Sequence, residues 1–79
     1  MKTTILLFGI ATDLVGSSSL EIELPANCNV LNFKEIIAKH AQLHKMSNYA
    51  VAINESYATD QTIIKEHDVI AIIPPVSGG

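Results

Sequence analysis

The sequence ends in Gly78-Gly79, and the α-carboxylate of Gly79, which we expect to be free, is the group best suited to do chemistry. Glycine has no Cβ, so a diglycine end can enter a slot too narrow for any other residue. The carboxylate has a pKa of about 3.5 and is ionised at neutral pH. Because an ionised carboxylate is a poor electrophile, another protein must first activate it, most simply as an acyl adenylate made with ATP. A frayed end without function is the alternative.

Residues 74–79 are expected to form an extended arm behind a domain made of residues 1–73. Pro74 and Pro75 have fixed φ and favour a stiff, extended segment. Six extended residues span about 20 Å, so the arm can reach well beyond the domain. The arm follows an apolar strand pattern that ends at Ile73 without a linker, which favours a functional arm over a frayed end.

Two candidate side-chain sites are weaker. His40 and His44 lie four residues apart on a predicted helix and would face together, with His44 on its apolar stripe. Two histidines without a third ligand make a poor metal site, and histidines at the edge of the core explain them better. Cys28 precedes the same helix, whose dipole could lower its pKa, but a small buried or loop cysteine is the favoured interpretation. We therefore expect no metal and no catalytic side chain here.

The remaining polar clusters are expected to be turns. Residues 17–19 are all serines, without the context of a nucleophile elbow. Residues 66–68, Glu-His-Asp, precede the last apolar run and suit a polar turn better than acid–base catalysis. The chain has no Gly-rich phosphate-binding pattern. We expect it to bind no cofactor itself.

Composition excludes several classes of protein. The 79 residues support one domain, and the apolar fraction of 48% is enough for one core. The net charge is −3 and the chain has five lysines but no arginine, which argues against nucleic-acid binding and suits a partner with a basic docking surface. Cys28 is the only cysteine, which indicates a reduced, cytoplasmic compartment. No apolar run is long enough to span a membrane.

The spacing of apolar residues predicts the elements of the domain. Strands are expected over 3–8, 20–24, 49–53 and 69–73, with a further short strand at Tyr57. A short helix over 10–15 should stop at Gly16, and a long helix over 30–46 should begin after an Asn29 cap. The run over 69–73 is continuously apolar, as expected of a central strand covered on both faces.

This order predicts a two-layer α+β domain, with a mixed sheet of four to five strands packed on one main helix. The first and last strands are the most apolar and should lie side by side in parallel. That arrangement is the ubiquitin-like β-grasp.

Both ends of the chain resemble a known family. The ending IIPPVSGG resembles that of the small subunits of molybdopterin synthase, which are ubiquitin-like sulfur carriers. The opening ILLFGIATDLVG resembles that family's first strand and short helix, and HDVIA resembles its turn into the last strand. The chain departs from the family at Thr12, where an arginine is frequent, and at Ile72-Ile73, where aromatic residues are common.

The resemblance implies a role for the tail. Gly79 would be adenylated by an E1-like enzyme that uses ATP and converted to a thiocarboxylate with the help of a sulfur-donating enzyme. It would then donate sulfur to cyclic pyranopterin monophosphate in molybdenum cofactor biosynthesis. The large subunit of a heterotetramer would supply the catalytic side chains. The resemblance assigns tail threading to Pro74, Pro75, Val76, Ser77 and Gly78, and partner docking to Phe8 and Ile73.

Several alternatives stay open. The chain could carry sulfur for thiamine thiazole or tRNA thiolation, or modify other proteins. It could be a β-grasp binding module with an inert tail, or a small enzyme that uses His44 or Cys28. From the residues alone, Phe8, Leu14 and Tyr57 are core or rim residues by default, with a docking surface as the alternative.

Overall fold

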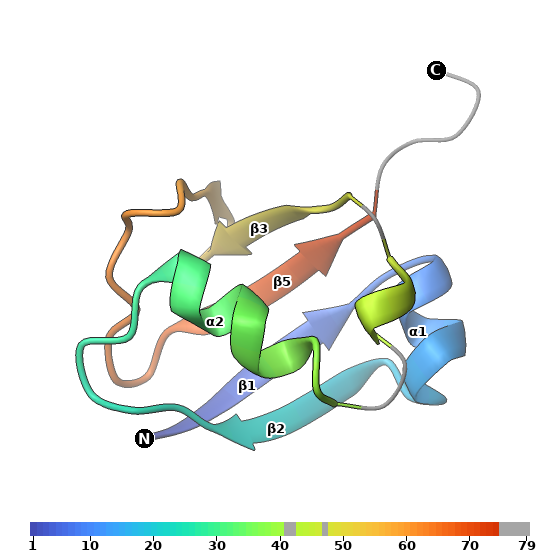
Figure 1. Cartoon of the computed structure of the whole chain (residues 1–79), viewed down its shortest axis with the longest axis horizontal. Coiled ribbons are helices and arrows are strands. Elements are labelled where there is room, and N and C mark those ends of the chain that lie inside the picture. The colour runs from blue at the N-terminus through green and yellow to red at the C-terminus, as the bar shows by residue number, and fades with distance from the viewer. Residues whose placement is uncertain (41–42, 47, 75–79) are drawn as a thin grey trace.

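The computed structural model describes residues 1–40, 43–46 and 48–74, and these form a five-stranded sheet with helix α2 packed across one face (Figure 1). The strand order is β2-β1-β5-β3-β4. The elements in chain order are β1 (Lys2–Leu7), α1 (Ile10–Val15), β2 (Ser19–Glu23), α2 (Val30–Ile37), the 3₁₀ helix η1 (Leu43–Lys45), β3 (Ala50–Ile53), β4 (Ser56–Tyr57) and β5 (Val69–Ile73).

Strand pairing confirms the ubiquitin-like β-grasp. β1 and β2 are antiparallel, with Ile5 opposite Leu20, and α1 lies in the connection between them. β5 lies beside β1 in parallel, with Ile5 opposite Ile70, and pairs antiparallel with β3 on its other side. The parallel pairing of the first and last strands is the arrangement that the sequence predicted.

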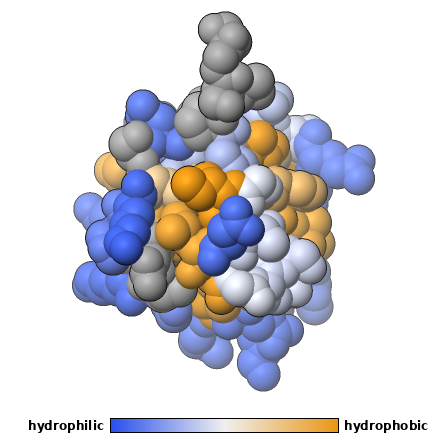
Figure 2. All heavy atoms as spheres, turned by 90° about the vertical axis from the view of Figure 1, so that its right-hand side faces the viewer, coloured by the Kyte–Doolittle hydropathy of each residue, from blue (hydrophilic) through white to orange (hydrophobic). Residues whose placement is uncertain are grey.

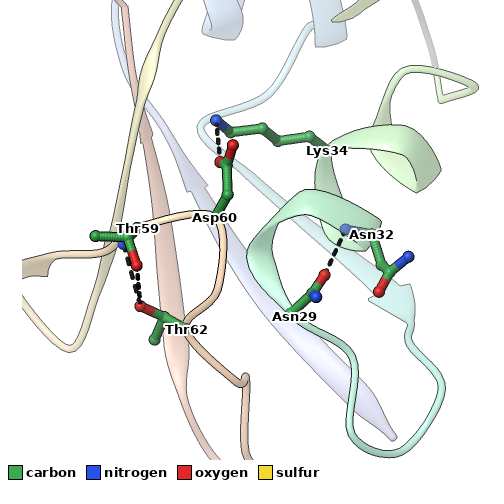
Figure 3. Close-up of polar contacts among 6 residues, drawn as sticks. All are labelled: Asn29, Asn32, Lys34, Thr59, Asp60 and Thr62. Carbon is green, nitrogen blue, oxygen red and sulfur yellow. Dashed lines mark hydrogen bonds and ion pairs between the residues drawn. The ribbon is translucent and has the colours of Figure 1, made fainter.

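The core lies between α2 and the sheet. Phe33 of α2 is completely buried, as are Ile5 of β1 and Ile70 of β5. Asn29 caps α2 as predicted, because its Oδ1 accepts a hydrogen bond of 2.8 Å from the backbone N–H of Asn32 (Figure 3). Apolar residues at helical spacing on α2 thus meet the alternate residues of the central strands.

The predicted helix over 30–46 is too long. α2 ends at Ile37, after which Lys39 and His40 donate to carbonyls three residues back, at Ile36 and Ile37. This tighter turn redirects the chain, and η1 packs beside α1 with Leu43 buried in the core. Burial of Leu43 therefore overrides the helical periodicity of the sequence.

The long connection between β4 and β5 is attached to α2. Lys34 of α2 forms an ion pair with Asp60 at 2.8 Å, and the Thr59 and Thr62 side chains bond to each other at 3.2 Å (Figure 3). The Lys34 ammonium also lies 5.8 Å from the centre of the Tyr49 ring. Burial, and then the negative charge of Asp60, raise the pKa of Tyr49. These contacts hold the connection against the helix and away from the opposite sheet face.

Candidate functional site

The candidate site is the face of the sheet that is turned away from α2. Residues directly opposite each other on paired strands point to the same face. Leu6 of β1 pairs with Ala71 of β5, which pairs with Ala52 of β3, which pairs with Tyr57 of β4. An apolar row therefore crosses four neighbouring strands on this face.

A groove of about 600 Å³ follows this row. Phe8 and Ile73 lie at one end of it, next to the start of the tail, and Phe8 is 49% exposed. Figure 2 is a view onto the end of the molecule where α1 lies. Hydrophobic surface is visible in the middle of this view and on its right, which is the side away from α2. The residues that line the groove are Leu6, Phe8, Ala52, Asn54, Glu55, Tyr57, Val69, Ala71 and Ile73.

The groove corrects the expectation that the last strand is covered on both faces. Ile70 and Ile72 are buried under α2, but Val69 is 39% exposed and Ala71 and Ile73 are only partly buried. The strand is continuously apolar because one face belongs to the core and the other lines the groove. An apolar face that no described residue covers is typical of a surface that binds another protein.

The start of the tail packs against the turn after β1. Gly9 has φ of 56°, and a Cβ placed on it would lie 3.3 Å from Cγ of Pro74. A side chain at this position would be strained by the backbone conformation and would also press on the proline ring. Gly16, by contrast, has φ of 84° with open space around it. Gly9 therefore allows the first tail residue to lie close to the β1–α1 turn.

The assigned site residues fall into two groups. Phe8 and Ile73 are placed together at one end of the groove, and Pro74 follows Ile73 and packs against Gly9; their docking and threading roles stay predictions. The other tail residues lie outside the described part of the chain, so the structure does not test their roles. These residues are Pro75, Val76, Ser77, Gly78 and Gly79.

The groove residues that could not be assigned from the sequence are Leu6, Ala52, Asn54, Glu55, Val69 and Ala71. A signal was present in β1, where Leu6 precedes Phe8 by two residues and so lies on the same face. For Ala52 and Ala71, nothing in the sequence fixes which residues of β3 and β5 lie opposite each other.

The competing side-chain sites do not assemble. His44 is exposed and lies on η1, so it shares no helix with His40. Among the side chains in the described ranges, no three His, Cys, Asp or Glu residues come together as a metal site would require. Cys28 is buried, as favoured, and burial raises the pKa of its thiol, which makes it a poor nucleophile.

The polar clusters form turns as predicted. The Ser17 hydroxyl donates to the carbonyl of Ser19 at 2.9 Å. In the turn before β5, the Asp68 carboxylate accepts from the Lys65 N–H at 2.7 Å and from Asn54 Nδ2 at 2.9 Å. Both Asp68 oxygens therefore hold the turn in place.

The helices in the described part of the chain all lack the combination of length and apolar character that is needed to cross a membrane.

Comparison with known proteins finds similarity over nearly the whole chain. Residues 5–79 match the model of the ThiS family. The molybdopterin synthase sulfur carrier subunit of Arabidopsis thaliana is 36% identical over 81 aligned residues that cover 100% of this chain and 84% of the relative.

Solved structures support the fold. SAMP1 from Haloferax volcanii superposes with a TM-score of 0.84 at 20% identity, covering 100% of both chains. A chain in the complex of subunits 1 and 2 of molybdopterin-converting factor from Helicobacter pylori superposes with a TM-score of 0.68 at 23% identity, again over 100% of both. At these identities the likeness shows the β-grasp fold.

Proposed function

The chain belongs to the ThiS family, and from this premise we propose that it is the sulfur carrier subunit of a molybdopterin synthase. The observation that carries the proposal is the similarity over the whole chain to relatives of that name, at 36% identity for the Arabidopsis protein. The fold supports it, because β5 leads directly into the tail beside an open apolar groove.

The working group is the C-terminal carboxylate of Gly79. An E1-like enzyme transfers the adenylyl group of ATP to a carboxylate oxygen, and pyrophosphate leaves. Hydrosulfide supplied by a sulfur-donating enzyme then displaces AMP, which carries that oxygen away, and the acyl carbon is left as a thiocarboxylate. The thiocarboxylate donates its sulfur to cyclic pyranopterin monophosphate in molybdenum cofactor biosynthesis.

The domain itself binds and positions. The groove docks the large subunit of the synthase, and Phe8 and Ile73 contribute apolar contact at the end next to the tail. Pro74, packed against Gly9, fixes where the tail leaves the sheet. The remaining tail residues thread into the active site of the large subunit, which supplies the catalytic side chains. The reduced state of the lone Cys28 suits the cytoplasm.

Deletion of Gly79 tests this function. In cells that lack their own sulfur carrier subunit, the full chain should restore molybdenum cofactor synthesis and the chain without Gly79 should not. A matched control is Glu35→Gln, which changes an exposed residue on α2. Restoration by the shortened chain at the level of the full chain would overturn the proposal.

A second candidate function is sulfur delivery to another pathway, such as thiamine thiazole or tRNA thiolation, or protein modification. It is favoured by the family model, which is described only as ThiS and does not name molybdopterin synthesis. Affinity measurements with the large subunit of molybdopterin synthase and with a thiazole synthase separate the two, because only the cognate partner should bind tightly.

A further inference from the structure

The groove on the open sheet face carries a charge at only one of its ends. Among the described residues that line it, Glu55 alone is charged, and it lies at the end opposite Phe8 and Ile73. Asp68 lies close to that end, but its two oxygens already accept hydrogen bonds from Lys65 and Asn54. The ion pairs of the described residues involve other acids, Glu23 and Asp60. The Glu55 carboxylate is therefore available to a partner.

Glutamate is an unfavourable residue for this position of the chain. Ile53 pairs with Ser56, so Asn54 and Glu55 form a two-residue hairpin loop, with φ of 50° and 71°. Loops with two left-handed residues prefer Asn-Gly, because glycine adopts positive φ without steric cost. Folding alone would thus favour glycine at position 55. Strained residues of this kind cluster at functional sites.

We propose that Glu55 is the specificity residue of the groove and pairs with an arginine or lysine on an apolar segment of the large subunit. This inference rests on the proposed function. The occupant is argued from charge complementarity, because a chain of net charge −3 favours a basic partner and the groove offers that partner one carboxylate. Covering the Glu55 carboxylate with an apolar segment is costly unless the carboxylate meets a counter-ion, so the groove also disfavours segments that carry no cation.

The position of Glu55 at one end of the groove also determines how the partner segment is oriented in the complex. Val69, at the Glu55 end of β5, and Ile73, next to the tail, are four residues apart, which corresponds to about 13 Å along a strand. Apolar contacts in the groove are not directional. A charge pair at one end fixes the orientation of the partner segment and therefore the side on which the tail enters the partner.

Glu55→Gln tests the charge. Binding of the intact chain to the purified large subunit of molybdopterin synthase from the same organism is measured by calorimetry at low and physiological salt. We expect Kd to rise about two- to fivefold at low salt, the range of an exposed ion pair, and the salt dependence of binding to weaken. The control is Glu35→Gln, which removes the same charge from α2 on the opposite layer and should leave Kd unchanged.

Glu55→Gly separates recognition from folding. Because glycine suits the left-handed position, this variant should unfold a few degrees higher than the natural chain and yet bind more weakly. A purely structural role for Glu55 cannot produce opposite changes in stability and affinity.

The outcomes distinguish this inference from the function on which it rests. If the natural chain does not bind the large subunit, the proposed function fails and this inference fails with it. If the natural chain binds, but Glu55→Gln and Glu35→Gln have the same Kd and salt dependence, only the role of Glu55 is overturned.

Discussion

Phe8→Ala should weaken binding to the large subunit while leaving the domain folded. Phe8 is 49% exposed at the end of the groove, next to the tail. A phenylalanine can bury roughly 150–250 Å², so about 75–120 Å² remains for a partner to cover. At about 25 cal/mol per Å², this area contributes about 2–3 kcal/mol. That free energy corresponds to a Kd increase of about 30- to 150-fold.

The matched control is Leu31→Ala. Leu31 is 48% exposed, almost the same fraction as Phe8, but it lies on α2, on the opposite layer of the domain. Calorimetric titration with the large subunit should show the loss of affinity for Phe8→Ala alone, and circular dichroism should show both variants folded. An unchanged Kd for Phe8→Ala, or equal losses for both variants, would refute the assignment of the groove as the docking surface.

Three further predictions concern the domain itself. Asn29→Ala removes the cap of α2 and should lower the free energy of unfolding by about 1 kcal/mol in urea titrations, whereas Asn29→Ser should retain most of it. The Met1 ammonium lies 2.6 Å from the Glu23 carboxylate and holds the pKa of Glu23 below its usual value. This ion pair therefore stabilises the fold above the unfolded-state pKa of Glu23, and the stabilisation is lost as pH falls through the folded-state pKa. Glu23→Gln should therefore flatten the acid limb of stability against pH, and an unaltered limb would contradict this. Burial and the Asp60 charge raise the pKa of Tyr49, so ultraviolet titration should place it above a free tyrosine, and Asp60→Asn should bring it part of the way back.

The sequence predicted the fold well because local signals and hydrophobic pattern agreed. Gly16 ends α1 with φ of 84°, Asn29 caps α2, and the alternation around Ile22 marks β2 with its acidic residues in water. These signals act within a few residues of the chain. The parallel pairing of β1 and β5 followed from their shared apolar character.

The errors arose where distant parts of the chain decide the structure. The helix over 30–46 looked continuous, but the gain from burying Leu43 beside α1 ended it at Ile37. The last strand looked covered on both faces, because an apolar sequence does not tell a core face from a docking face. The groove depends on strand register, with Ala71 between Leu6 and Ala52, and register is not encoded in any one segment.

Only part of the candidate site could be predicted from the sequence. Phe8 and Ile73 entered through family resemblance, and the structure places them together in one groove. Glu55 gave no signal, because a lone glutamate between two apolar runs is typical of an ordinary turn. Its importance became visible only from its positive φ and its place in an apolar lining.

The chemical state of the Gly79 carboxylate is the most direct test of the proposed sulfur carrier. The purified chain is incubated with an E1-like activating enzyme, ATP and a sulfur-donating enzyme, and its intact mass and C-terminal fragments are then measured. We expect exchange of one oxygen for sulfur, located at Gly79 and dependent on ATP. A C-terminus that keeps both oxygens under these conditions, while an established sulfur carrier in the same mixture is converted, would contradict it.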